Sequence, residues 1–144
     1  MEIIKYSLPN IDCVARGLIT HYIHVDTIIL FNGDMGIGKT TLISAIVKNL
    51  GYKKNISSPT YSYYNEYNIN EQLTIRHFDL YKIKNLKEFE ELGFHELIIP
   101  HPELIIIIEW PEIIQHLLNS INKKTIITYS YCDENKREIS IIRH

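Results

Sequence analysis

The stretch that decides the fold runs from residue 27 to residue 50 and reads Thr-Ile-Ile-Leu-Phe-Asn-Gly-Asp-Met-Gly-Ile-Gly-Lys-Thr-Thr-Leu-Ile-Ser-Ala-Ile-Val-Lys-Asn-Leu. Its first part, Thr27–Asn32, is a short apolar run, which predicts a strand buried on both faces of a parallel sheet. Its last part, Lys39–Leu50, predicts a helix that ends at Gly51. The glycine-rich segment between them predicts a tight turn from strand to helix.

The turn matches the phosphate-binding pattern G-x-x-x-x-G-K-[ST] at Gly33–Thr40. Glycines let the backbone fold round a phosphate with its N–H groups inward, and the next helix presents its positive N-terminus to the same anion. At this spacing Lys39 reaches the β- and γ-phosphates, and the Thr40 hydroxyl is placed to ligate Mg²⁺. A turn without a ligand would need neither side chain, so we predict a nucleotide site. Its expected binding residues are Gly33, Asp34, Met35, Gly36, Ile37, Gly38, Lys39, Thr40 and Thr41.

Two acidic residues follow predicted strands, and either could serve such a site. Asp79 comes near the end of the segment 73–80, and Glu109 directly follows the apolar run 104–108. Ligands of open parallel sheets bind beyond the carboxyl ends of the strands, so both acids are expected to face the nucleotide. One would hold Mg²⁺ and the other would orient or deprotonate the attacking water. The alternative for each is an ordinary acidic strand end.

The remaining segments alternate between predicted strands and helices. Strands are expected at 3–7, 60–67, 73–80, 104–108, 125–131 and 137–142, and helices at 11–22, 86–92 and 112–118, with turns at 68–71 and 133–136. This alternation predicts an α/β fold, a single P-loop NTPase-like domain over residues 1–144. We expect a central, mostly parallel sheet with antiparallel edge strands and helices on both faces.

Composition excludes several classes of protein. The 144 residues are 45% hydrophobic and 22% charged, which excludes wholesale disorder. The sequence contains no run long and apolar enough for a membrane span and no signal-peptide pattern. Two cysteines are too few for a disulfide framework, so we expect a reducing, cytoplasmic setting. The net charge is −2, so the chain lacks the excess of basic residues that is typical of nucleic-acid binding. We therefore expect another subunit to hold any RNA.

Base and reaction type follow by exclusion. Guanine-specific relatives usually carry N-K-x-D, and the nearest string, Asn-Lys-Lys-Thr at 122–125, lacks the aspartate, which favours ATP. Small-molecule kinases of this fold close an Arg-rich lid over the phosphate, yet no arginine lies between residues 77 and 136. We therefore expect slow intrinsic hydrolysis, which an arginine supplied by a partner would accelerate. A small nucleotide kinase and an ATP-dependent scaffold remain alternatives.

Four motifs together resemble the TsaE (YjeE) family, the bacterial ATPase of tRNA threonylcarbamoyladenosine (t6A) synthesis. They are the turn Gly33–Thr41, Ser-Pro-Thr-Tyr at 58–61, His-Phe-Asp-Leu-Tyr at 77–81 and Glu-Trp-Pro at 109–111, with Glu-Leu-Gly at 91–93 between the last two. Their order and spacing match, and they are far more specific than the turn alone. The chain departs from the family at Lys82, where an arginine is common, so a bidentate contact there is in question.

The resemblance implies a P-loop fold that binds ATP with Mg²⁺ and hydrolyses it weakly by itself. It implies work with TsaD and TsaB, which modify adenosine 37 of tRNA, so tRNA is met only through the complex. Thr40 and Glu109 are then associated with the metal, and Asp79 belongs to the catalytic centre. We therefore expect Thr40, Glu109 and Asp79 at the metal, and Asp79, Lys39 and Glu109 in catalysis.

Other residues of these motifs allow two interpretations from the sequence. Thr60 is expected to bind the nucleotide as a switch threonine does, the alternative being a strand-entry turn. Trp110 covers the nucleotide or a partner surface, or fills the core, which is favoured. The tyrosines of 61–67 fit an interface or a half-buried edge strand, and the strand is favoured. His77 is interpreted as a packing or hydrogen-bonding histidine.

Overall fold

One sheet collects strands from the whole length of the chain. The computed structural model describes residues 1–56 and 62–144. Within them, seven strands lie in the order β1-β7-β6-β2-β5-β4-β3. The strands are β1 (Glu2–Tyr6), β2 (Thr27–Asn32), β3 (Tyr64–Asn70), β4 (Leu73–Asp79), β5 (Leu104–Glu109), β6 (Lys124–Asp133) and β7 (Lys136–Arg143). Neighbours among β6, β2, β5 and β4 are parallel, whereas β1–β7, β7–β6 and β4–β3 are antiparallel, which confirms the predicted sheet.

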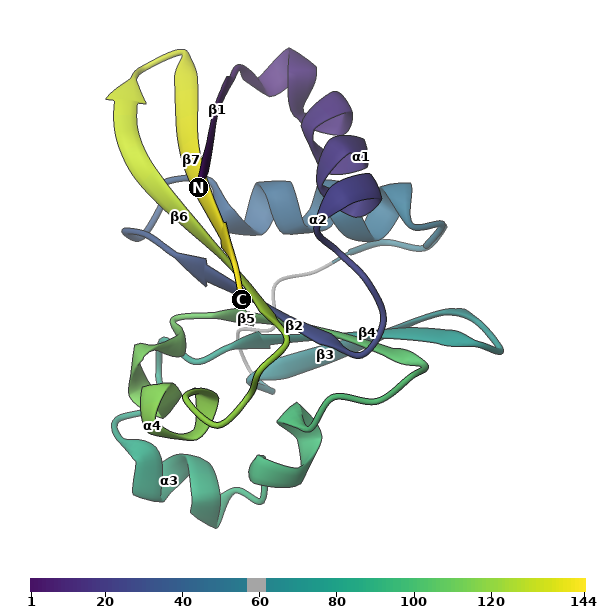
Figure 1. Ribbon diagram of the computed structural model, residues 1–144, viewed down its shortest axis with the longest axis vertical. Coiled ribbons are helices and arrows are strands. Elements are labelled where there is room, and N and C mark those ends of the chain that lie inside the picture. Colours follow the sequence, from purple (N-terminus) through teal and green to yellow (C-terminus); the bar gives the residue numbers. More distant parts are fainter. Residues whose placement is uncertain (57–61) are drawn as a thin grey trace.

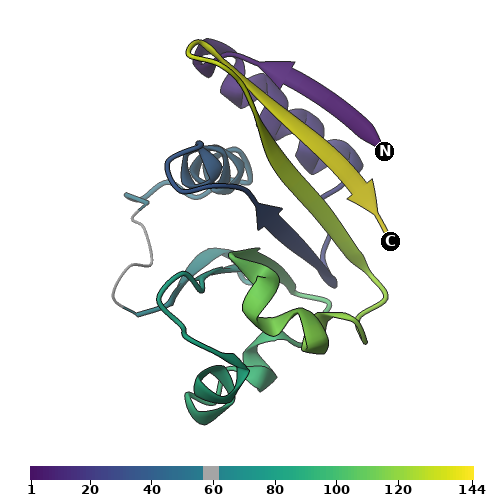
Figure 2. The same ribbon diagram turned by 90° about the vertical axis from the view of Figure 1, so that its left-hand side faces the viewer.

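Helices cover both faces of this sheet, as the sequence predicted (Figure 1). One face carries α1 (Ile11–His21) and α2 (Lys39–Asn49), which pack on each other. The opposite face carries α3 (Leu86–Glu91) and α4 (Gln115–Leu118), and Figure 2 shows the two layers from the side. Short 3₁₀ turns lie at Leu8–Asn10, His95–Ile98 and Pro111–Ile114. Among the described residues, no helix is long and apolar enough to cross a membrane.

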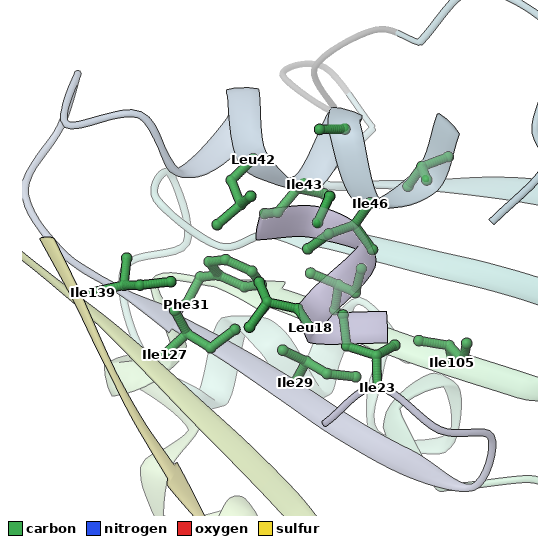
Figure 3. Close-up of a cluster of buried hydrophobic side chains, with 14 of the residues drawn as sticks. Leu18, Ile23, Ile29, Phe31, Leu42, Ile43, Ile46, Ile105, Ile127 and Ile139 are labelled. Carbon is green, nitrogen blue, oxygen red and sulfur yellow. The ribbon is translucent and has the colours of Figure 1, made fainter. Parts of the chain in front are cut away.

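The interiors of the two central strands, residues 28–31 of β2 and 104–108 of β5, are apolar because each face of the sheet has its own core. Along β2, Ile29 and Phe31 pack under α1 and α2, as Figure 3 shows, whereas Ile28 and Leu30 enter the core of the other face. All residues of β5 are buried, Glu109 at its end included. A charged side chain is almost never fully buried without partners, so Glu109 identifies the edge of the sheet where a site should lie.

The Tyr-rich strand differs from its predicted bounds. The prediction covered 60–67, of which residues 60 and 61 lie outside the described residues, and the strand begins at Tyr64. Tyr63 has a φ of 64°, which interrupts the extended backbone immediately before Tyr64. The strand continues to Asn70, so the turn lies at 71–72 rather than at 68–71. The Asn70 side chain accepts a hydrogen bond from the Gln72 N–H at 2.8 Å, which closes that turn.

Candidate functional site

The glycine-rich turn connects β2 to α2 and requires glycine at both of its ends. Gly33 has a φ of 148°, and a Cβ at that position would lie 2.8 Å from the Cβ of Tyr129 on β6. Gly38 immediately precedes the first residue of α2. Its φ of 113° is a left-handed backbone conformation that residues with a side chain rarely adopt. The turn is therefore held against β6, and its backbone leads into the N-terminus of α2, where unpaired N–H groups favour an anion.

Lys39 is the first residue of α2, and it is 5% exposed. Its ammonium donates a hydrogen bond to the Gly33 carbonyl and lies 3.9 Å from the centre of the Trp110 ring. Burial lowers the pKa of Lys39, and the carboxylates of Glu109 and other nearby acids oppose that shift. Among the described residues, no carboxylate forms a salt bridge with Lys39, so a phosphate at this point would supply an opposite charge at close range.

Asp79 and Glu109 end β4 and β5 and lie side by side in the parallel register. The Thr40 hydroxyl donates a hydrogen bond to Oε1 of Glu109 at 3.0 Å, so the first turn of α2 contacts the end of β5. Oδ1 of Asp79 accepts a hydrogen bond from the Tyr81 N–H at 3.1 Å. Burial raises the pKa of Asp79, and the nearby Glu109 carboxylate adds to the shift, while the Tyr81 N–H, His77 and Lys39 oppose it.

These groups surround a cavity of about 240 Å³ at the carboxyl ends of β2, β4 and β5. Its lining residues are Met35, Gly36, Gly38, Lys39, Thr40, Thr41, Asp79, Tyr81, Glu109 and Trp110. The structure thus brings together the catalytic and metal-binding residues expected from the sequence. Of the other expected binding residues, Gly33, Asp34 and Ile37 belong to the turn without lining the cavity, and Thr60 lies outside the described residues.

A wider hollow of about 820 Å³ lies beside α1 and α2, away from the acids. It is lined by Lys48, Lys53 and Lys54, and its one acidic residue, Asp12, accepts a hydrogen bond from the Asn49 side chain. Its lining includes neither the glycine turn nor Thr40, Asp79 and Glu109. The smaller cavity is therefore the candidate site.

The donor set of the smaller cavity suits a magnesium nucleotide. Among the described residues, no group of three or more His, Cys, Asp or Glu could hold a metal ion by itself. Mg²⁺ commonly takes one or two carboxylates, a hydroxyl and substrate phosphates rather than an all-protein cage. Thr40, Glu109 and Asp79 supply hard oxygen atoms of this kind beside the glycine-rich turn.

Three residues at the site make contacts that the sequence did not predict. Tyr81 lines the cavity and packs against Trp110, with 5.0 Å between ring centroids and 52° between the ring planes. Trp110, for which core filling was favoured, packs on one core cluster and also lines the cavity. His77, predicted to pack or to form a hydrogen bond, contacts Glu109 at 2.7 Å between Nε2 and Oε2. All three belong to the motifs that resemble the TsaE family, and those motifs were the signal by which the sequence could have marked them as site residues.

Comparison with known proteins places the chain in a family. A family model described as "Threonylcarbamoyl adenosine biosynthesis protein TsaE" matches residues 10–139. The chain belongs to the TsaE family. A TsaE-named tRNA threonylcarbamoyladenosine biosynthesis protein of Rickettsia felis is 40% identical over 126 residues, covering 87% of this chain and 70% of the relative. Its namesake from Haemophilus influenzae is 35% identical over 114 residues, or 79% of this chain and 68% of the relative.

The fold of this TsaE-family chain also matches a solved structure. A crystal structure of Bacillus subtilis YdiB aligns with a TM-score of 0.66 at 20% sequence identity, covering 97% of this chain and 84% of that chain. This likeness concerns the fold. Together with the family match, it confirms the α/β fold and the resemblance that the four motifs indicated.

Proposed function

We propose that this TsaE-family chain is a Mg²⁺-dependent ATPase of low intrinsic activity that serves the TsaD–TsaB transferase during t6A formation at adenosine 37 of tRNA. The observation that carries the proposal is the 3.0 Å hydrogen bond between Thr40 and Glu109 inside the cavity next to the glycine turn. It joins a P-loop hydroxyl to an acid at the end of the neighbouring strand, which is the arrangement that P-loop proteins use for a nucleotide-bound metal.

Each residue has a stated task in this proposal. Lys39 and the backbone N–H groups of the turn hold the phosphates and counter the charge that develops on them. The Thr40 hydroxyl and the Glu109 carboxylate would hold Mg²⁺, which would neutralise part of the phosphate charge. Asp79 orients the water that attacks the γ-phosphate, and burial raises the pKa of its carboxyl group. The products are ADP and inorganic phosphate.

Slow intrinsic turnover follows from the charges at the site. Among the described residues that line the cavity, Lys39 is the only cation. A P-loop site without an arginine on the transferring phosphate is slow, and an arginine supplied by a partner raises the rate by about 10³–10⁵-fold. A docked TsaD–TsaB complex is the proposed source of that missing charge or of an equivalent ordering of the site.

Trp110 provides a direct test because it is the chain's single tryptophan and lines the cavity. We expect ATP to change the Trp110 fluorescence in a Mg²⁺-dependent manner. We also expect phosphate release to be slow for the chain alone and to rise when TsaD and TsaB are added. A phosphorylated acceptor in place of free phosphate would indicate a kinase. Full tRNA modification by a variant that binds but cannot hydrolyse ATP would indicate a scaffold.

A further inference from the structure

We propose that His77 is a positioning residue that holds the Glu109 carboxylate in the orientation that binds the metal. The inference rests on the proposed function, because it concerns how the metal-binding acid of that site is held. It assigns a task to a buried polar side chain that the proposed hydrolysis does not itself use.

The contact comes from two neighbouring parallel strands. His77 lies on β4 opposite Ile107 of β5, so Glu109, two residues further on, projects from the same face of the sheet at a diagonal position. Nε2 of His77 lies 2.7 Å from Oε2 of Glu109, and each of the two side chains is 2% exposed. Water therefore contributes little to orienting this carboxylate, and its protein partners determine where its oxygens point.

The two oxygens of Glu109 have different partners. Oε1 accepts from the Thr40 hydroxyl on α2, and Oε2 contacts His77 on β4. A hydroxyl that binds a cation through a lone pair keeps its hydrogen, so Thr40 can hold Oε1 with the metal present. The carboxylate is thus fixed from both sides, and removal of His77 frees it to rotate.

The histidine ring also shows which atom carries the hydrogen. An ionised carboxylate only accepts hydrogen bonds, so Nε2 is the nitrogen that donates in this contact. Among the described residues, Nδ1 of His77 is the one buried side-chain nitrogen or oxygen without a hydrogen-bond partner. An unpaired buried polar atom lowers stability. Interior neighbours on the same face, such as Ile75 and Ile107, are apolar, so packing alone does not call for a histidine here.

Two substitutions of similar size separate positioning from packing. The amide nitrogen of His77→Gln can reach the place of Nε2, whereas that of His77→Asn corresponds to Nδ1 and stops short of Glu109. The readout is the Mg²⁺ concentration that half-saturates ATP hydrolysis and the Trp110 fluorescence change. We expect His77→Asn to raise the half-saturating Mg²⁺ concentration by about 10–100-fold, because loss of a partner behind a metal ligand weakens metal binding to this degree. For His77→Gln the same concentration should stay within about threefold of the wild-type value. ATP binding measured without Mg²⁺ should change little in either variant.

The outcomes distinguish this inference from the proposed function. If nucleotide binding and hydrolysis by the wild type do not depend on Mg²⁺, both the metal site and the proposed function are wrong. A Mg²⁺-dependent wild type with an unaltered His77→Asn variant, or equal losses in both variants, would overturn the positioning role alone. If both variants fail to fold, ¹⁵N NMR of the histidines in the wild type tests the inference by showing which ring nitrogen of His77 carries the hydrogen. The Nε2–H tautomer at His77 supports the inference, and the Nδ1–H tautomer overturns it.

Discussion

Asp79 and Glu109 lie directly opposite each other at the carboxyl ends of β4 and β5. Two carboxylates at the ends of adjacent strands repel each other, and both lose hydration when they are buried. Both effects destabilise the protein when no ligand is bound. The pKa of Asp79 is raised for both reasons, with burial the larger cause. A cation bound beside them would relieve the cost, so their arrangement favours ligand binding over the stability of the free protein.

The Thr40 hydroxyl should be needed for hydrolysis more than for nucleotide binding. Thr40→Val keeps the shape of the side chain and removes the oxygen that contacts Glu109. We expect at least a roughly tenfold loss of Mg²⁺-dependent hydrolysis, because one ligand of the metal is removed. Thr40→Ser retains the hydroxyl and is the matched control, with most of the rate preserved. Equal rates for the valine variant and the wild type would remove Thr40 from the metal site.

Asp79→Asn should lower hydrolysis and stabilise the free protein at neutral pH. The folded pKa of Asp79 is raised, so the folded state keeps its proton to a higher pH than the unfolded chain does. Stability is then lost as the pH rises from the ordinary aspartate range through the folded pKa. The asparagine variant avoids this loss, and its melting temperature should exceed that of the wild type at pH 7.

The difference should shrink as the pH falls through the ordinary aspartate range, where the wild-type carboxyl is protonated in both states. Melting curves of both proteins without nucleotide between pH 3 and pH 7 provide the measurement. Glu71→Gln, in the exposed hairpin turn, is the control for a lost surface charge. An asparagine variant that melts below the wild type throughout would contradict the destabilising role of the Asp79 charge.

Gly33→Ala should destabilise the chain while Gly17→Ala should not. The new Cβ at position 33 would meet the Cβ of Tyr129 at 2.8 Å on a backbone with a φ of 148°. We expect a cost of about 1–3 kcal/mol, measured by urea unfolding. Gly17 lies within α1 with nothing within 4 Å of an added Cβ. Alanine there should stabilise the helix by about 0.5–1 kcal/mol, and the opposite order of the two variants would refute this account of the turn.

Two buried tyrosines anchor the turn, and their hydroxyls should not contribute equally. Tyr129 donates to the Gly38 carbonyl at 3.2 Å and shares a 2.7 Å hydrogen bond with Tyr6. Burial raises the pKa of both tyrosines, so both hydroxyls keep their hydrogens at physiological pH. Tyr129→Phe leaves Tyr6 without this partner and should cost about 1–3 kcal/mol of unfolding free energy.

Tyr6→Phe is the matched comparison, because Tyr129 then keeps its bond to Gly38. Its expected cost is about 0.5–1.5 kcal/mol, the net value of one hydrogen bond. Urea unfolding of both variants and of the double variant measures the coupling between the two hydroxyls. A Tyr6→Phe variant less stable than Tyr129→Phe would contradict the anchoring of the turn through Tyr129.

Local patterns predicted much of the fold and the candidate site. The apolar runs of β2 and β5, the spacing of the glycine turn and the acids Asp79 and Glu109 depend on short-range sequence, so each could be recognised without the structure. Parallel strands end at one edge of a sheet, which places the two acids next to the turn. The side chain of Asn85 caps α3 by accepting from the Glu88 N–H, a contact of the same short range.

What the sequence did not predict depends on contacts between distant segments. His77 and Glu109 are 32 residues apart, and only the register of β4 and β5 makes them diagonal neighbours. Tyr129 reaches Gly38 across 91 residues, and no local pattern indicates that contact. The start of β3 depends on a positive φ at Tyr63, a conformation that a tyrosine seldom takes and that the alternation of side chains does not reveal.

The edge of the sheet formed by β1 has a consequence for biosynthesis. β1 begins at Glu2, and its partner β7 ends at Arg143. The register pairs Glu2–Tyr6 of β1 with residues 137–141 of β7, so β1 gains this strand partner only after β7 has left the ribosome. Non-local pairings of this kind slow folding. Tyr6 lies on β1, so the glycine-rich turn gains the support of the Tyr6–Tyr129 hydrogen bond only after β1 has paired with β7.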